Sequence, residues 1–195
     1  IQVDRYLHQL DAPYIGVDNR AVGRRAVTHL LDHGLRRVAY ISAFMGVSTG
    51  RDRYEGYRAA LEEAGVGYDP NLVLAEHQAA ESISAVASFG GQACMRLLQE
   101  GPVDGIVCNS DKTAVGVVQC LRQLGKRVPE DVRVVGCDDD QLIAASSGMR
   151  ITGFAYPYEE IAEELLLLIR RLVRRPAVSR TRIELEARFV QGETA

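Results

Sequence analysis

The 195-residue sequence lacks most of the patterns that identify enzymes and membrane proteins. No apolar run approaches the length needed to cross a membrane, and no charged-then-apolar leader opens the chain, so we expect neither a membrane partner nor an export signal. The P-loop, the G-x-S-x-G turn and a G-x-G-x-x-G turn after a strand are absent. No repeat and no low-complexity stretch is found either. Nothing in the sequence therefore proposes an enzyme, and we expect none.

Cysteine is scarce, and its spacing matches no common metal motif. Two of the four cysteines, Cys108 and Cys137, lie in apolar, strand-like runs, where cysteine acts as a small hydrophobic residue. His29 and His33 are four residues apart, but no third ligand is evident, so a helix face is the better interpretation. We expect no metal and no cofactor, and unpaired cysteines favour a reducing cytoplasm.

The remaining composition is that of an ordinary globular protein. The chain is 47% hydrophobic and 25% charged, which is enough to bury a sizeable core. Its formal net charge of −3 gives no overall attraction to nucleic acid. The bulk numbers therefore point to a folded domain that does not hold DNA by charge.

Strand-like runs alternate with helical runs along the chain. The predicted strands are 1–4, 14–17, 38–42, 72–75, 105–108, 132–137, 151–155 and part of 181–189. The predicted helices are 20–33, 51–64, 91–99, 112–124 and 158–174. Near-continuous apolar strands that alternate with helices predict an α/β fold whose parallel sheets are covered on both faces.

The helix predicted at 158–174 is unusual because it is apolar almost all round from Leu165 to Ile169. Such a helix is buried on more than one side. We therefore expect a partner subunit, or a segment of chain beyond this sequence, to pack against it.

Polar side chains gather where the predicted strands end. In open α/β sheets, ligands bind beyond the carboxyl ends of the strands. The polar residues at four such ends are Asp4 and Arg5; Arg51 and Arg53; Asn109, Ser110 and Asp111; and Asp138, Asp139 and Asp140. Carboxylates accept hydrogen bonds from hydroxyl groups, and guanidinium groups donate a fixed fork of them. This rim suits a polar ligand such as a sugar or a nucleoside.

Each of these residues also has a purely structural interpretation. Arg51 and Arg53 are expected in the first helical turn, where a cation costs about 0.3–1 kcal/mol, so Arg53→Ala is predicted to lose ligand binding with little loss of stability. Arg51 could equally pair with Asp52 or with solvent. Asp111 is most simply an N-cap. Asp138 closes a buried strand, where an unpaired carboxylate is costly, so we favour a functional or paired role.

Four longer motifs occur in order and cover most of the chain. They are VDRYL, YIGVDNRAVGRRAVTHLLDHGLRRVAYISA, STGRDRYEGYRAALEEAGVGYDPNLV and NSDKTAVGVVQCLRQLGKRVPEDVRVVGCDDD. With them the chain resembles the effector-binding core of the lactose-repressor-type (LacI/GalR) bacterial transcription regulators. The last motif, with VPEDV before VVGCDD, is the most specific.

The resemblance implies a fold of two doubly wound parallel-sheet subdomains of the periplasmic-binding-protein type, joined by three crossing strands. The amino subdomain is expected at 1–34 and 156–177 and is incomplete in this chain, and the carboxyl subdomain is expected at 35–155 and 178–195. The family is dimeric, so a homodimer is expected. A helix-turn-helix domain with its hinge, and the first part of the amino subdomain, are expected outside this sequence, and operator DNA would be bound only through that domain.

The resemblance also implies a ligand site in the cleft between the subdomains. Its expected residues are Arg5, Thr49, Arg51, Arg53, Ser110, Asp138 and Tyr156. Arg53 matches the arginine of an R-x-x-G-Y motif, and Asp138 matches the first acid of V-V-G-x-D-D. Two departures affect the identity of the effector. SSGMRITGF replaces a proline-rich PPLTTV segment, and the longer segment 77–91 offers only Phe89 as a stacking aromatic.

The leading hypothesis is an effector-sensing domain of a bacterial repressor, in which a sugar or nucleoside changes the closure of the two subdomains. One alternative is an exported sugar-binding protein of the same fold. Another is an α/β enzyme that acts on a sugar, which would need a base or nucleophile with a perturbed pKa at the rim.

Overall fold

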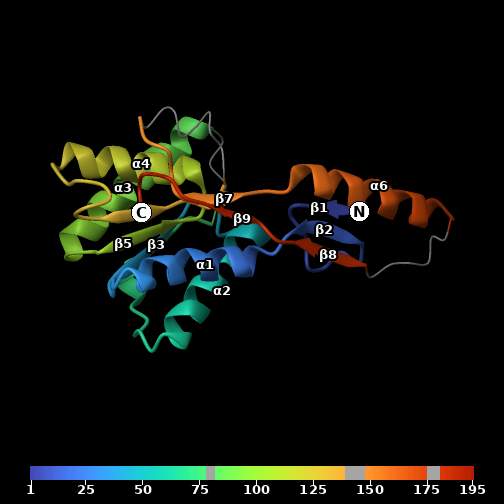
Figure 1. The fold of residues 1–195 in the computed structure, drawn as a ribbon, viewed down its shortest axis with the longest axis horizontal. Coiled ribbons are helices and arrows are strands. Elements are labelled where there is room, and N and C mark those ends of the chain that lie inside the picture. Colours follow the sequence, from blue (N-terminus) through green and yellow to red (C-terminus); the bar gives the residue numbers. More distant parts are fainter. Residues whose placement is uncertain (78–81, 139–147, 175–180) are drawn as a thin grey trace.

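The computed structural model describes residues 1–77, 82–138, 148–174 and 181–195, which form two unequal lobes (Figure 1). Its strands are β1 (Gln2–Val3), β2 (Tyr14–Val17), β3 (Val38–Ser42), β4 (Val73–Ala75), β5 (Gly105–Cys108), β6 (Arg133–Val135), β7 (Gly153–Ala155), β8 (Arg182–Leu185) and β9 (Arg188–Val190). Its helices are α1 (Asn19–Asp32), α2 (Ser48–Glu63), the short 3₁₀ helix η1 (Pro70–Leu72), α3 (Ile83–Glu100), α4 (Asp111–Gln123) and α6 (Tyr158–Arg174).

The larger lobe is a parallel sheet with helices on both faces. Its strand order is β4-β3-β5-β6. Successive residues of β3 face opposite sides, as a strand requires. Ala39 and Ile41 lie in the hydrophobic cluster formed with α3 and α4, whereas Val38 and Tyr40 lie in the cluster formed with α1 and α2. The doubly covered parallel sheet predicted from the apolar strands is confirmed here.

The smaller lobe is a three-stranded parallel sheet, ordered β1-β2-β8, against which α6 packs. The chain passes between the lobes three times, from β2 to α1, from β7 to α6 and from β8 to β9 (Figure 1). At this junction β7 pairs antiparallel with β9, and a bridge between Val135 and Thr152 joins the ribbon to the larger sheet. The three crossings are those expected from the family resemblance.

Two segments lie in a different lobe from the one expected. The first 34 residues were assigned to the amino subdomain, but α1 packs against α2 in the larger lobe because its residues Val22, Val27 and Leu30 are buried in the same cluster as Tyr57. The chain after residue 178 was assigned to the carboxyl subdomain, but β8 pairs with β2 and is a strand of the smaller sheet. The sequence pattern gives no information on which of two sheets a late strand joins.

Two helices begin three or more residues earlier than the sequence predicts. α3 begins at Ile83 instead of residue 91, because the Ser82 hydroxyl accepts a hydrogen bond from the Ala85 amide and caps the helix. α2 begins at Ser48 instead of residue 51, so Arg53 is its sixth residue. The dipole penalty assigned to Arg53 is therefore wrong, because that effect fades beyond the first turn. Among the described residues, no helix has the length and apolarity needed to span a membrane.

Candidate functional site

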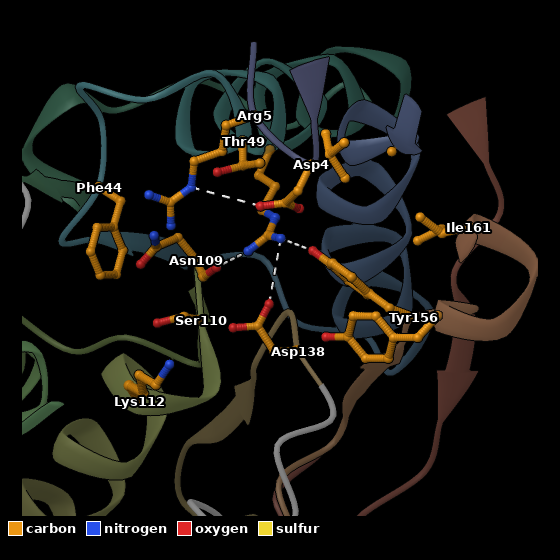
Figure 2. Close-up of a pocket in the computed structure, with 14 residues that line it drawn as sticks. Asp4, Arg5, Phe44, Thr49, Asn109, Ser110, Lys112, Asp138, Tyr156 and Ile161 are labelled. Carbon is orange, nitrogen blue, oxygen red and sulfur yellow. Dashed lines mark hydrogen bonds and ion pairs between the residues drawn. The ribbon is translucent and has the colours of Figure 1, made fainter. Parts of the chain in front are cut away.

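A cavity of about 600 Å³ lies where the two lobes meet (Figure 2). Its walls come from β2 and the carboxyl ends of β1, β3, β5 and β6, from the first turns of α2 and α4, and from the start of α6 with the chain that leads into it. The residues that line it are Val3, Asp4, Arg5, Gly16, Phe44, Thr49, Arg53, Asn109, Ser110, Lys112, Asp138, Tyr156, Tyr158 and Ile161. The predicted rim of strand ends is thus a real concave surface.

Arg53 is the central side chain of this cavity, and only 5% of its surface is exposed. Its Nε donates to Asn19 Oδ1 at 2.8 Å, and its two terminal nitrogens donate to the Asn109 carbonyl and the Tyr156 hydroxyl. One of those nitrogens lies 3.5 Å from a carboxylate oxygen of Asp138 (Figure 2). Burial alone would lower the pKa of Arg53, but Asp138 and other neighbours outweigh it, and the net pKa is raised. Arg53 is therefore held as a fixed cation between the lobes.

Two glycines allow Arg53 to reach its partners. A Cβ on Gly23 of α1 would lie 2.0 Å from the carbonyl oxygen of Arg53, and a Cβ on Gly56 of α2 would lie 2.1 Å from that of Arg20. Since real side chains do not tolerate such distances, only glycine lets α1 and α2 approach this closely. The close crossing brings Arg53 to Asn19, the first residue of α1.

Two carboxylates face the Arg53 guanidinium from different lobes. Asp138 follows β6 in the larger lobe, and Asp4 follows β1 in the smaller one. Asp4 has a φ of 62°, a left-handed conformation that is uncommon for residues other than glycine and is concentrated at functional sites. Burial raises the pKa of Asp4, while Arg53 and Arg5 act to lower it and Asp138 to raise it. The pair offers hydrogen-bond acceptors to a ligand held between the lobes.

The start of α4 forms another part of the wall. Asp111, expected as the N-cap, is instead the first residue of the helix, and the Ser110 hydroxyl caps it by accepting a hydrogen bond from the Thr113 amide. The buried Asp111 carboxylate accepts a hydrogen bond from the Asp138 amide at 3.2 Å. Asp111 therefore positions the backbone of Asp138, and the N-terminus of α4, with Lys112, is directed to the cavity.

Six of the seven residues predicted for the site line this cavity: Arg5, Thr49, Arg53, Ser110, Asp138 and Tyr156. Arg51 does not, because its guanidinium donates to the Gly46 carbonyl at 3.0 Å and so braces the loop after β3. Asp139 and Asp140 lie outside the described residues.

Several lining residues were missed by the sequence analysis. The most informative is Phe44, which lies in the loop after β3 with its ring 5.9 Å from the Arg5 guanidinium. Phe89, the expected stacking aromatic, instead packs from α3 against the core of the larger lobe. Lys112 and Tyr158 are further lining residues that sequence reasoning did not select. The rule of strand ends, applied to whole loops, would have included Phe44 but not Tyr158.

The sequence of residues 27–195 matches the family described as periplasmic binding protein-like domain. The HTH-type transcriptional regulator CelR of Thermobifida fusca is 33% identical over 183 residues, which cover 93% of this chain and 51% of the regulator. The ribose operon repressor of Halalkalibacterium halodurans is 30% identical over 195 residues, which cover 100% of this chain and 55% of the repressor. The chain thus spans about half the length of these relatives.

Solved structures agree with the sequence comparison. A complex of the transcriptional regulator CelR with cellobiose matches with a TM-score of 0.85 and 30% identity, over 99% of this chain and 57% of that chain. The transcription regulator CcpA of Lactococcus lactis, at 23% identity and a TM-score of 0.82, shares the fold over 99% of this chain and 68% of its own.

Proposed function

Because the chain belongs to the periplasmic binding protein-like domains of LacI-family transcriptional regulators, we propose that it senses a small polar effector for a DNA-binding protein. A sugar or nucleoside would bind in the cavity between the lobes and change their closure, and a helix-turn-helix domain elsewhere in the protein would respond. The observation that carries this proposal is the buried Arg53, held at the lobe junction with one carboxylate facing it from each lobe.

The chemistry of the cavity favours a ligand rich in hydroxyl groups. Asp4 and Asp138 can accept hydrogen bonds from neighbouring hydroxyls, and Arg5 and Lys112 can donate them. The ring of Phe44 offers an apolar face to one side of a sugar. Thr49, Ser110 and Tyr156 add hydroxyl groups to the wall, so the cavity discriminates ligands by their pattern of polar atoms.

The relatives separate the leading hypothesis from its alternatives. The Thermobifida fusca relative is named as a transcriptional regulator and the Halalkalibacterium halodurans relative as an operon repressor. These names favour regulation over export or catalysis. We expect such a regulator to work in the cytoplasm as a homodimer. The exposed apolar residues of α6, which are Leu166, Leu167, Ile169 and Val173, form the surface where we expect a second copy or another part of the protein to pack.

Thermal unfolding with a panel of ligands tests the proposal. We expect one member of a set containing cellobiose, ribose, other mono- and disaccharides and common nucleosides to raise the melting temperature, since a ligand stabilises the state that it binds. Asp138→Asn should remove this shift, whereas the surface variant Glu100→Gln should keep it. If no sugar or nucleoside at millimolar concentration moves the melting temperature of the intact protein, the proposal fails.

A further inference from the structure

Tyr6 lies beside the cavity and belongs to the smaller lobe by the contacts of its ring. It follows β1, and its ring meets that of Tyr14 in β2 edge to face, with 5.1 Å between the centroids. The guanidinium group of Arg182 in β8 lies 4.4 Å from the centre of the Tyr6 ring. Contacts of these two kinds are each favourable. The ring is therefore fixed to all three strands of the smaller sheet.

The polar groups of Tyr6, in contrast, bind the larger lobe. Its backbone amide donates to the Ser48 hydroxyl at 2.9 Å. Its phenol hydroxyl lies 2.9 Å from each carboxylate oxygen of Asp52. Ser48 and Asp52 are the first and fifth residues of α2, and both are buried. One residue thus joins the smaller sheet to the first turns of a helix of the larger lobe.

Asp52 depends on this contact. Its carboxylate is buried, and a buried carboxylate is costly unless it is hydrogen-bonded or paired. The nearest charged partner of Asp52 in the described structure is Arg20, whose Nε lies 4.0 Å from the carboxylate. A terminal nitrogen of Arg20 is already paired with Glu55 at 2.5 Å. Asp52 also precedes Arg53 in α2, so one turn of helix holds both the lobe contact and the centre of the cavity.

We propose that Tyr6, through Asp52 and Ser48, is an interlobe latch that sets the spacing of the two lobes. The three chain crossings join the lobes covalently but leave their angle free to vary, as hinges do. The latch adds a non-covalent contact close to the crossing from β2 to α1, where Asp52 lies 4.0 Å from Arg20, so breaking it removes a restraint on that angle. Tyr6 lines no part of the cavity and is a positioning residue.

One consequence rests on the proposed function: if the cavity binds its effector with the lobes close together, a broken latch lowers the fraction of protein ready to bind. The apparent dissociation constant then rises in inverse proportion to that fraction. The latch itself does not depend on any ligand, so it can be tested separately.

The test measures the distance between the lobes by electron–electron double resonance. Spin labels are attached through Lys126→Cys, beyond α4, and Arg170→Cys, on α6, both of which are exposed. Labelled intact protein is diluted with unlabelled protein so that distances within one chain dominate. In Tyr6→Phe we expect the population with the longer distance to grow about tenfold, which corresponds to about 1.4 kcal/mol.

Tyr57→Phe is the matched control. The Tyr57 hydroxyl is also buried, but it donates to the Val38 carbonyl at 3.0 Å, entirely within the larger lobe. It should lower stability without changing the distance. Asp52→Ala should reproduce Tyr6→Phe, and the double variant should add nothing, because the two residues act as one pair. An unchanged distance in Tyr6→Phe, an equal shift in Tyr57→Phe, or additive effects of the pair would each overturn the latch.

The proposed function and the latch can fail independently of each other. If the distance changes as expected but no sugar or nucleoside binds to any variant, the proposed function fails and the latch stands. If a ligand binds and Tyr6→Phe leaves both its affinity and the distance unchanged, the latch fails and the proposed function stands.

Discussion

The two lobes differ in how completely their sheets are covered. In the larger lobe every residue of β3 and β5 is buried between two hydrophobic clusters. In the smaller lobe, β8 alternates between exposed and half-buried residues, and α6 has a single buried residue, Leu168. The larger lobe therefore has a complete core of its own, whereas the described part of the smaller lobe has only part of one.

This difference separates stability from recognition. Apolar area removed from water stabilises a fold by about 25 cal/mol per Å², so most of the folding free energy of this chain comes from the larger lobe. The smaller lobe contributes Asp4, Arg5 and the residues at the start of α6 to the cavity, and Tyr6 to the junction. Its exposed apolar side chains on α6 form the surface where we expect further contacts. A lobe that is weakly held by its own core is well suited to move.

The largest effect is expected at the junction, from Arg53→Ala. The structure reverses the sequence-based prediction for this variant, because Arg53 is buried, has four polar partners and lies beyond the first turn of α2. Its removal takes the cation from Asp138, whose side chain is 30% exposed, so the cost should lie toward the lower end of the roughly 3–5 kcal/mol that breaking a buried pair costs. Urea unfolding without ligand should show this loss.

Arg51→Ala is the control, since Arg51 lies in the same helix and makes one exposed hydrogen bond. It should change the unfolding free energy by at most about 0.5 kcal/mol. Equal stability of the two variants would restore the view that Arg53 serves only the ligand.

The next effect tests the contrast between the lobes directly. Ile106 in β5 is completely buried, and Ile106→Ala should cost about 2–5 kcal/mol. Leu166 in α6 is 57% exposed, and Leu166→Ala should cost less than about 0.5 kcal/mol in a monomer. Both are measured by chemical unfolding at several protein concentrations. A large, concentration-dependent cost for Leu166→Ala would show that a second copy covers α6.

Much of this architecture follows from local patterns in the sequence. The strands predicted at 14–17, 38–42 and 105–108, and the helix predicted at 158–174, have the observed bounds. Short, fully apolar runs between glycine or polar residues leave little choice of structure. The sheet joined by β8 was not predictable in this way, because its alternating pattern fits any edge that needs a strand.

The site was predictable where topology alone fixes it. The carboxyl ends of parallel strands meet at one edge, which brought Arg53, Ser110 and Asp138 together as expected. Arg51 does not line the cavity, because residues two positions apart lie about 200° apart around a helix. One helix could therefore not direct both Arg51 and Arg53 to the cavity. Phe44 was missed because the rule of strand ends was applied to the polar residues and not to the whole loop after β3, and Lys112 was missed because the rotation of α4 depends on packing that no short motif encodes.

The smallest effect we expect is the pH dependence that His29 adds in the larger lobe. His29 lies near the end of α1, with its ring 4.7 Å from that of His33 and 4.8 Å from that of Phe189. Burial, His33 and Arg133 together lower the pKa of His29 below its ordinary value of 6.5, against weaker opposing effects of Ala195 and Asp32. The unfolded chain therefore binds a proton more readily than the folded one, and stability falls as the pH drops below 6.5.

The raised pKa values of Asp4 and Asp52 act in the opposite direction at lower pH, so the comparison must be made between variants. Unfolding free energies at pH 7 and pH 5 should differ less in His29→Gln than in the wild type. His77→Gln, which removes an exposed histidine after β4, is the control. Parallel pH profiles for the wild type and His29→Gln would show that His29 is not linked to folding.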